Sequence, residues 1–451
     1  MWYYKDIISA TGGKLYRLKQ ESFPGISTDS RTIKEGELFI PLKGKRFDGH
    51  DFIRDAIEKK GGGTLCEESK VARVKDTEGT IITVHDTNRA FIDIARFRRK
   101  LLDSTFVAIT GSCGKTTTKE ILVNITKKAF SIEFNEKNYN NIFGVCSKLI
   151  SIKQSPKVGV FELGTNFPGE IRTLTEIVEP DVSVITNVNP AHLEGLGSIE
   201  GILNEKLDIF RYTKDGGTIL VNRDDKLLTN YKDEKKRTLY FGIKNPGHFS
   251  LTVEKDLGWQ GYKVTLDFMG EKIRTKTRLI GFHNLYNVLI ASLVAFILGV
   301  GQDKIAEGVE EFEPYPMRMC PKRSKRGYTV IDDTYNANPA SMYEAVKTLS
   351  LLPCEGKKIL VLGDMNELGE YSSYYHRELG RHIKSMNFDC VFLFGEKIYD
   401  AYFEAQKENV FYFEDIQGLL EKLTSVLKEG DCVLIKGSRA LNMDKIVEEI
   451  I

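Results

Sequence analysis

One short stretch constrains the fold of this chain more than any other: residues 106–118, where an apolar run meets a glycine-rich turn. The turn carries Gly111, Gly114 and Lys115, and the threonines that follow open a predicted helix. Backbone N–H groups at a helix N-terminus attract phosphate, glycines let the backbone approach it, and a lysine adds a point charge. A hydroxyl after that lysine, here on Thr116, is typical of a Mg²⁺ ligand. The stretch therefore predicts a strand, a phosphate-binding loop and a helix in succession.

The match to the standard phosphate loop is incomplete. That pattern has a glycine five positions before Gly114, where this chain has Ile109. A shorter Gly-x-x-Gly-Lys-Thr form remains, in the strand-to-helix context that the motif requires. A chance loop of small residues is the alternative, but the context favours a nucleoside triphosphate site.

Length, charge and cysteine content limit the number of domains and the class of protein. A chain of 451 residues is too long for one core, so about three domains are expected. The formal net charge of +1 gives no overall field for nucleic acid. No basic segment precedes an apolar one at the start of the chain, and no apolar run is long enough to span a bilayer. The 7 scattered cysteines fit a reducing cytoplasm, and Cys113 reads as a small loop residue more than as a reactive thiol.

The pattern of predicted elements divides the chain into residues 1–100, 101–313 and 314–451. The first segment combines a strand at 37–42, a loop at 43–50, and helices at 51–60 and 86–102. The middle segment has apolar strands typical of a buried parallel sheet, followed by an antiparallel excursion at 238–277 and an apolar helix at 281–298. The predicted parallel strands are 106–110, 158–163 and 182–186. The last segment repeats an α/β pattern, with strands at 328–331, 359–362, 391–394 and 433–435.

Two polar residues lie at or just after predicted strands of the middle segment, where α/β enzymes keep their ligands. Glu162 interrupts an apolar run, so it either faces a cation such as Mg²⁺ or makes a structural ion pair. His192 follows the next strand, and position alone leaves a surface role and a site role equally open. Lys206 lies in a helix, where a lysine is normally a solvated surface residue.

The remaining polar candidates have both a structural and a functional interpretation. Asn284 and Asn287 begin a helix and could read a base edge, although helix capping is the better interpretation of Asn284. Arg318 follows a Pro-Tyr-Pro turn, and residues 332–339 (Asp-Asp-Thr-Tyr-Asn-Ala-Asn-Pro) suit either a turn or a site for ribose and a polar substrate. Residues 436–439 (Lys-Gly-Ser-Arg) offer cations for a carboxylate or phosphate.

These pieces, in this order, resemble the Mur ligase family, the ATP-dependent amide-forming enzymes of peptidoglycan synthesis, over nearly the whole chain. The resemblance rests on the segments 27–31, 47–50, 110–117, 138–141 with Gly144, 191–195, 332–339, 363–369 and 436–439. The last three segments are similar to those of the family members that add D-alanyl-D-alanine. Cys113, Thr334 and Asn366 depart from the family motifs, but none removes a group that the chemistry needs.

The resemblance implies a small α/β substrate domain, a central ATPase-like parallel-sheet domain and a C-terminal Rossmann-like domain. It also implies the ligands: ATP, Mg²⁺, a UDP-N-acetylmuramoyl-tripeptide and D-alanyl-D-alanine, with no nucleic acid partner, no membrane insertion and a monomeric, cytoplasmic enzyme. The resemblance assigns catalytic and metal-binding roles to Lys115, Thr116, Glu162, His192 and Lys206. In many of these ligases the lysine that corresponds to Lys206 is carbamylated. ATP would contact Thr110, Gly111, Ser112, Cys113, Gly114, Lys115, Thr116, Thr117, Asn287, Arg318 and Asp333. The substrates would contact Ser30, Arg31, Asp48, Gly49, His50, Asn141, Tyr335, Asn336, Asn338, Pro339, Lys436, Ser438 and Arg439.

Two other interpretations stay open at this point. A different ligase of the same superfamily would share the ATP loop. It could be a folylpolyglutamate synthetase, against which the N-terminal substrate segment argues, or a ligase that adds a different amino acid. A non-catalytic nucleotide-binding regulator is the alternative from another class, although no base-specific motif of a GTP switch is evident.

Overall fold

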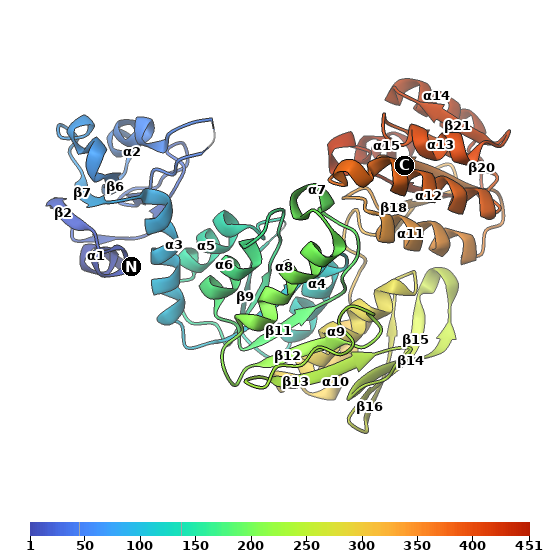
Figure 1. Cartoon of the computed structure of the whole chain (residues 1–451), viewed down its shortest axis with the longest axis horizontal. Coiled ribbons are helices and arrows are strands. Elements are labelled where there is room, and N and C mark those ends of the chain that lie inside the picture. Colours follow the sequence, from blue (N-terminus) through green and yellow to red (C-terminus); the bar gives the residue numbers. More distant parts are fainter. Residues whose placement is uncertain (45, 137) are drawn as a thin grey trace. The chain divides into compact units, whose positions relative to one another are not determined.

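The computed structural model describes residues 1–44, 46–136 and 138–451 (Figure 1). Lys45, in the predicted loop at 43–50, lies outside the described residues. The described chain forms two compact units. The first contains Met1–Phe106, Glu133–Phe161 and Thr173–Glu179, and the second contains Val107–Ile132, Glu162–Arg172 and Pro180–Ile451. Four elements carry residues of both units: β8 (Thr105–Thr110), β9 (Ile132–Phe134), β10 (Val158–Glu162) and α6 (Glu170–Val178).

The first unit is built on a five-stranded sheet of order β2-β7-β6-β5-β4. Its strands run parallel except for the antiparallel edge strand β2. Their bounds are β2 (Lys14–Arg17), β4 (Ile26–Ser27), β5 (Leu38–Phe39), β6 (Gly63–Glu67) and β7 (Thr80–Val84), and a separate antiparallel pair joins β1 (Trp2–Tyr3) to β3 (Ser22–Phe23). The predicted strand at 37–42 is thus shortened to β5. Pro41 has no N–H to donate, which explains why the ladder stops there.

Helices cover this sheet, and their buried faces supply its core. They are α1 (Tyr4–Thr11), η1 (Gly49–Phe52), α2 (Ile53–Lys59), η2 (Glu68–Arg73) and α3 (Thr87–Lys100). The remaining helix of this unit, α5 (Ile142–Ser151), packs against α3. The helix predicted at 51–60 is confirmed, except that its first turn is the 3₁₀ element η1. The helix predicted at 86–102 is α3, capped by the Asp86 carboxylate, which accepts the Arg89 N–H at 2.8 Å.

In the second unit, seven strands of the described chain follow the order β16-β15-β14-β13-β12-β11-β8. The new bounds are β11 (Val182–Ile185), β12 (Thr218–Asn222), β13 (Arg237–Gly242), β14 (Phe249–Asp256), β15 (Tyr262–Phe268) and β16 (Glu271–Thr277). The strands from β8 to β14 pair in parallel, and β14, β15 and β16 pair antiparallel.

The prediction of an antiparallel excursion over 238–277 was therefore wrong for its first strand, because β13 continues the parallel sheet. The alternation of buried and exposed residues in β13 predicts a half-buried strand but not the direction of its partner. Long-range contacts set that direction: the Asp224 carboxylate accepts the N–H groups of Ile243, Lys244 and Asn245 and fixes the chain after β13.

The helices that pack beside these strands are α4 (Lys115–Thr126), α7 (Leu193–Leu196), α8 (Ile199–Arg211), α9 (His283–Ile297) and α10 (Gln302–Glu310), with the short η3 (Gly258–Gln260) between β14 and β15. The predicted apolar helix at 281–298 is α9, and most of its residues are buried. It packs against α4, the helix that follows the glycine-rich turn. A helix that is apolar nearly all round belongs in a core, as this one does.

The last part of the second unit contains a six-stranded sheet of order β17-β18-β22-β19-β20-β21, parallel except for β17. Its strands are β17 (Cys320–Arg323), β18 (Thr329–Asp332), β19 (Lys358–Gly363), β20 (Cys390–Phe394), β21 (Val410–Phe413) and β22 (Cys432–Lys436). The four predicted strands are confirmed as β18, β19, β20 and β22, whereas β17 and β21 were not predicted. The helices are α11 (Pro339–Leu351), η4 (Gly369–Tyr371), α12 (Ser372–Ser385), α13 (Tyr399–Ala405), α14 (Ile416–Val426), η5 (Arg439–Leu441) and α15 (Asp444–Ile450).

The prediction of an α/β fold built on parallel sheets is confirmed. The seven cysteines are all free thiols in the described chain. Among residues 1–44, 46–136 and 138–451, no helix combines the length and apolar character that a bilayer crossing requires.

Candidate active site

The glycine-rich turn has a geometry that only glycine satisfies at two positions. It joins the end of β8 to the start of α4, as predicted. Gly111 has a φ of 149° and Gly114 a φ of 81°. A Cβ on Gly111 would lie 1.9 Å from Thr186 Oγ1, and one on Gly114 would lie 2.3 Å from Asn287 Oδ1. Both glycines are therefore required by conformation and by the close approach of a neighbouring side chain.

Residues after β11 hold the turn in place. The Ser112 N–H donates to the Asn187 carbonyl at 2.9 Å, and the Cys113 N–H donates to Asn187 Oδ1 at 3.0 Å. The Thr186 hydroxyl donates to the Cys113 carbonyl at 2.6 Å. These bonds make the loop a preformed part of the sheet edge rather than a mobile connection.

Lys115, Thr116 and Glu162 lie at this edge. Lys115 Nζ donates to the Gly111 carbonyl at 2.7 Å, and burial lowers the pKa of its ammonium while the Glu162 carboxylate opposes that shift. Glu162 is the last residue of β10 and is 2% exposed. Thr116, in the first turn of α4, is also buried. A half-buried cation, a buried carboxylate and a buried hydroxyl thus share one site, as the sequence predicted for the first two strand ends.

Lys206 is buried, so the interpretation of this residue as solvated surface was wrong. It lies in α8 and is 1% exposed. Burial, reinforced by the positive charge of Lys115, lowers the pKa of Lys206 to about 7. A lysine in a Lys- and Glu-containing helix looks solvated when only the helix is considered, and its burial depends on contacts that the helix sequence does not contain.

The neighbouring Glu205 is also buried and has a structural role that sequence reasoning missed. Its carboxylate accepts the Gly169 N–H at 2.6 Å, the Ile171 N–H at 2.7 Å and the Thr165 hydroxyl at 3.0 Å. These bonds tie α8 to the chain that follows β10.

His192 meets a carboxylate from the C-terminal part of the chain. Its Nδ1 lies 2.6 Å from Glu367 Oε2, and the Glu194 N–H donates to the Glu367 carbonyl at 3.0 Å. The histidine partner lowers the pKa of Glu367. Both residues have left-handed backbones, with φ of 56° for His192 and 64° for Glu367. Glu367 belongs to the family-like segment 363–369, but it was not among the predicted site residues.

The two asparagines of α9 differ in role. Phe282 is the N-cap of α9, and Asn284 instead donates to the Ile280 carbonyl at 2.8 Å, so the capping interpretation of Asn284 was wrong. Asn287 donates to Asn284 Oδ1 at 2.8 Å and accepts the Thr118 hydroxyl at 3.1 Å. Asn287 therefore packs directly against the turn at Gly114.

Arg318 reaches the same turn from the C-terminal segment. Its guanidinium donates to Thr116 Oγ1 at 3.1 Å and lies 3.9 Å from the centre of the Tyr335 ring. Met317 and Met319, on either side of it, have φ of 62° and 48°. A left-handed backbone conformation costs free energy in any residue other than glycine. It persists only where the surrounding structure enforces it, often at functional sites.

Asp333 and Lys436 pair at the carboxyl ends of β18 and β22. Lys436 Nζ donates to Asp333 Oδ2 at 2.6 Å and to the Asn336 carbonyl at 2.9 Å, while Asp333 Oδ1 accepts the Met319 N–H at 3.0 Å. Asp333 was predicted to contact ATP and Lys436 a substrate, and the structure brings these two residues together.

The other predicted C-terminal residues make local contacts. Asn338 is the N-cap of α11 with Pro339 as its first residue, and its amide lies 3.2 Å from Cys113 Sγ. Ser438 Oγ accepts the Asn366 N–H at 2.8 Å, and Arg439 pairs with Asp444 at 2.9 Å. The turn interpretation of residues 332–339 is thus correct for Asn338, which also faces the phosphate loop.

The predicted substrate residues of the first unit include a compact polar cluster. Asp48 Oδ1 lies 2.7 Å from His50 Nδ1, and Lys70 Nζ donates to Asp48 Oδ2 at 2.7 Å. His50 Nε2 accepts the Glu67 N–H at 3.1 Å, so Nδ1 carries the ring proton. Lys70 and Glu67 were not predicted, because neither lies in a motif.

The remaining first-unit residues contribute to local structure. Gly49 packs so closely that a Cβ would lie 2.6 Å from the Leu42 carbonyl oxygen. Ser30 is buried, and Arg31 is an exposed side chain that donates to Asp29 at 2.9 and 2.8 Å. Asn141 is the N-cap of α5 and accepts the Gly144 N–H at 2.9 Å.

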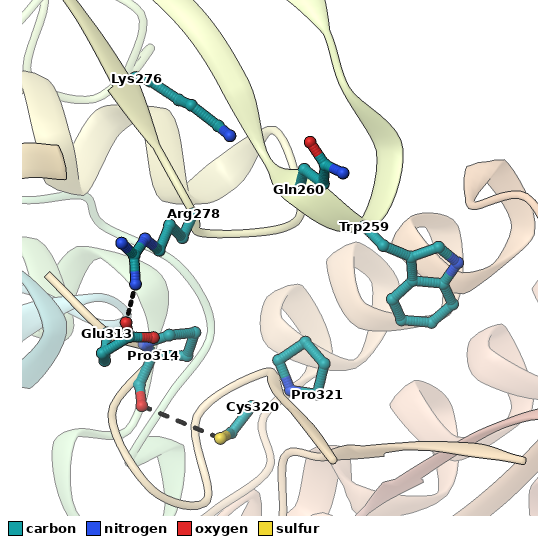
Figure 2. A pocket seen from close by; sticks show the side chains of 8 residues that line it. All are labelled: Trp259, Gln260, Lys276, Arg278, Glu313, Pro314, Cys320 and Pro321. Carbon is teal, nitrogen blue, oxygen red and sulfur yellow. Dashed lines mark hydrogen bonds and ion pairs between the residues drawn. The ribbon is translucent and has the colours of Figure 1, made fainter. Parts of the chain in front are cut away.

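A cavity of about 620 Å³ lies away from these residues, between the β14–β16 strands and the start of the C-terminal segment (Figure 2). An ion pair joins Arg278 to Glu313 at one wall. The lining residues are Trp259, Gln260, Lys276, Arg278, Glu313, Pro314, Cys320 and Pro321. The predicted site residues lie elsewhere in the described chain.

Comparisons with known proteins cover the whole chain. Three family models match: the Mur ligase family catalytic domain at residues 22–101, the Mur ligase middle domain at 109–295, and the Mur ligase glutamate ligase domain at 317–439. The UDP-N-acetylmuramoyl-tripeptide–D-alanyl-D-alanine ligase of Bacillus subtilis is 30% identical over 99% of this chain and 98% of its own. The enzyme of the same name from Buchnera aphidicola subsp. Acyrthosiphon pisum is 34% identical, over 99% and 97%.

Solved structures agree with the sequence relatives. A MurF crystal structure from Acinetobacter baumannii has a TM-score of 0.92 and 29% identity, and the match covers 100% of this chain and 98% of that one. The MurF ligase of Thermotoga maritima in complex with ADP has a TM-score of 0.85 and 29% identity, over 94% and 96%. With its phosphate loop, its α/β fold, three successive segments that match Mur ligase domain models and relatives that match it end to end, this chain belongs to the Mur ligase family.

Proposed function

We propose that this protein is an ATP-dependent ligase that joins D-alanyl-D-alanine to UDP-N-acetylmuramoyl-tripeptide through a new amide bond. The observation that carries the proposal is the phosphate loop bridged by Arg318, which donates from the C-terminal segment to Thr116 at 3.1 Å. The relatives that match this chain over 99% of its length are named for this reaction.

The reaction proceeds in two steps. The terminal carboxylate of the tripeptide attacks the γ-phosphorus of ATP, which forms an acyl phosphate and releases ADP. The amine of D-alanyl-D-alanine then attacks the acyl carbon, loses a proton, and the tetrahedral oxyanion collapses with loss of inorganic phosphate. In this proposal Lys115, next to the Gly111 carbonyl, and Arg318, next to Thr116, neutralise charge on the transferred phosphoryl group. The protein then contributes mainly position and electrostatics.

Mg²⁺ fits the donor set at this edge. Mg²⁺ is usually held by one or two protein oxygen ligands together with substrate phosphates and water. The Thr116 hydroxyl and the buried Glu162 carboxylate provide such ligands, with His192 as a further candidate. Among the described residues, no group of three or more His, Cys, Asp or Glu side chains could hold a metal ion. The ion supplies Lewis-acid stabilisation of phosphate charge.

Lys206 is suited to carbamylation. Because its pKa is lowered to about 7, much of this amine is neutral near neutral pH. Only the neutral amine attacks CO₂, forming a C–N bond and releasing a proton. The resulting carbamate is an anion that can ligate Mg²⁺, and its charge would be favourable beside Lys115.

The other assignments belong to the same proposal. The cluster at Asp48, His50 and Lys70 suits the uridine nucleotide, and the residues around Tyr335 and Lys436 suit the dipeptide. The domain limits 1–100, 101–313 and 314–451, the monomeric state and the cytoplasmic location stay predictions.

The decisive experiment is phosphate release from Mg²⁺ and ATP, with the tripeptide nucleotide and D-alanyl-D-alanine supplied singly and together. We expect release only with both, and a pentapeptide product by mass. Release with the nucleotide and a different amine would keep the family and change the specificity. ATP binding without release under any combination would contradict catalysis and favour a nucleotide-binding regulator.

Lys115→Ala supplies the control for this assay. It should abolish ligation while circular dichroism and the melting temperature stay near those of the unmodified protein. Near-normal turnover in this variant would refute the role of Lys115.

A further inference from the structure

The pair formed by His192 and Glu367 joins two parts of the second unit that are far apart in sequence. His192 precedes α7, and Glu367 precedes η4. Three contacts hold them: Nδ1 to Oε2 at 2.6 Å, the Glu194 N–H to the Glu367 carbonyl at 3.0 Å, and the packing of Gly369, where a Cβ would lie 3.2 Å from Glu194 Cα.

The backbone conformations of His192 and Glu367 indicate that the fold enforces the contact between them. His192 and Glu367 both have positive φ, which non-glycine residues rarely adopt. An exposed ion pair alone would contribute little, and the Glu367 side chain is 48% exposed. Two strained residues that face each other, with a backbone hydrogen bond alongside, indicate that the fold enforces their contact.

The two ring nitrogens of His192 explain what the contact with Glu367 could do. A histidine that serves a metal through one ring nitrogen usually has its other nitrogen held by a carboxylate, which fixes the ring and raises its basicity. Here the carboxylate is at Nδ1, so Nε2 is the nitrogen left to serve a metal. The same carboxylate attracts the Lys115 ammonium, which places its charge near the phosphate loop.

We propose that Glu367 is a positioning residue that fixes the His192 imidazole through Nδ1 and so makes Nε2 available to nucleotide-bound Mg²⁺. Because Glu367 comes from the C-terminal part of the chain, this support is present only when that part lies against the segment at His192. The inference rests on the proposed function, in which His192 serves the metal.

The test compares Glu367→Gln and Glu367→Ala with Glu370→Ala, a matched change at an exposed glutamate three residues further on. Calorimetry measures ADP affinity with and without Mg²⁺, and steady-state assays give kcat against Mg²⁺ concentration. We expect Glu367→Ala to lose about 10-fold or more of the Mg²⁺-dependent gain in affinity, Glu367→Gln to lose less, and Glu370→Ala to lose none. Metal-free ADP affinity should not change in any of them.

His192→Asn completes the cycle, since asparagine tolerates the left-handed backbone at that position. If Glu367 acts through His192, the double variant should be no worse than His192→Asn alone. Two results would overturn the inference. In one, the losses of Mg²⁺-dependent affinity from the two single variants add in the double variant. In the other, the Glu367 variants lose metal-free ADP affinity and melting temperature as much as they lose Mg²⁺-dependent affinity, which would mean that the pair only stabilises the fold.

Two further outcomes separate the inference from the function on which it rests. If His192→Asn weakens Mg²⁺ dependence and the Glu367 variants do not, the inference alone fails. If His192→Asn has no effect on Mg²⁺ dependence, the metal role of His192 fails and the inference with it. Ligase activity itself is judged separately, by the mass of the product that the unmodified protein makes.

Discussion

Burial shifts the pKa of individual lysines in this protein in a way that their local sequence does not reveal. Lys206 is the clearest case: the same lysine on the outer face of α8 would be a permanent cation, whereas the buried one has a pKa of about 7. Lys115 is shifted in the same direction by the same cause. Two desolvated lysines that repel one another favour an anion between them, such as a phosphate or a carbamate.

Removing dissolved CO₂ and bicarbonate should therefore lower ligase activity several-fold, and adding bicarbonate should restore it. The physical reason is that the neutral Lys206 amine exchanges CO₂ with solution. The measurement is the initial rate in degassed and in bicarbonate-supplemented buffer, together with the carbamate carbon signal after addition of ¹³C-labelled bicarbonate. An unchanged rate and no such signal, in protein that still ligates, would contradict carbamylation.

Asp48 gives a pH prediction in the first unit. Burial raises the pKa of this carboxyl, but hydrogen bonds from Lys70 and His50 outweigh that effect and hold the pKa well below its usual range. A depressed folded pKa stabilises the protein above the unfolded pKa of about 4, and that stability is lost as pH falls below it.

Asp48→Asn should thus lower the stability of the protein at pH 7 by about 1–2 kcal/mol, and the difference should shrink as pH falls below about 4. Melting curves at pH 7, 5 and 3 measure it. Asp51→Asn, at a 66% exposed carboxyl with a loose partner at 3.8 Å, is the control and should change little. A difference that does not depend on pH would show that the Asp48 charge is not what stabilises this cluster.

Sequence reasoning was most accurate for elements whose signals are local. The strand, turn and helix around Gly114 follow from adjacent residues, and β8 and α4 lie where they were predicted. The direction of β13 and the existence of β17 and β21 depend on neighbours remote in sequence, and these were wrong or missed. The role of Asn284 was also mistaken, because α9 begins at His283, two residues earlier than a cap at Asn284 would allow.

The glycine-rich turn allows two effects of a glycine-to-alanine substitution to be separated: the clash of the added Cβ with a neighbouring side chain, and the strain of a left-handed backbone. Gly114 and Gly299 have φ of 81° and 84°, but a Cβ on Gly114 would clash with Asn287 whereas one on Gly299 meets nothing within 4 Å. Each alanine substitution should cost about 1–2 kcal/mol for the left-handed backbone. Only Gly114→Ala should also weaken ATP binding, by 10-fold or more, as measured by calorimetry. Equal ATP affinity in the two variants would refute the fit at Gly114.

At the scale of the whole molecule, the site of the second unit draws on residues hundreds of positions apart. The motif residues at Lys115, Thr116 and Glu162 could be predicted, since each follows from its own strand end. The partners of those residues could not: Glu367 for His192 and the Tyr335 ring for Arg318 are set by tertiary packing. The family resemblance supplied the role of Lys206, which its helix alone argued against.

Arg318 tests this long-range assembly. Arg318→Ala should lower kcat by about 100-fold or more, because the guanidinium would no longer reach the phosphate loop, with a smaller effect on ADP binding. Arg318→Lys should not restore the rate, since an ammonium cannot both stack on Tyr335 and donate to Thr116. Steady-state kinetics and calorimetry measure the two effects. Full activity in Arg318→Lys would show that charge alone suffices.

The composition of the first unit has a practical consequence for dissecting this enzyme. It is assembled from three separate stretches of chain, and α3 is where they meet: Phe91 stacks on Phe143, Arg98 donates to the Ile152 carbonyl, and Arg99 donates to the Val178 carbonyl. A fragment cut after residue 100 would keep α3 but lose every one of these partners. Its apolar face would then be open to water and prone to aggregate. The role of the first unit is therefore better tested by mutating its residues within the intact chain than by cutting the chain at residue 100.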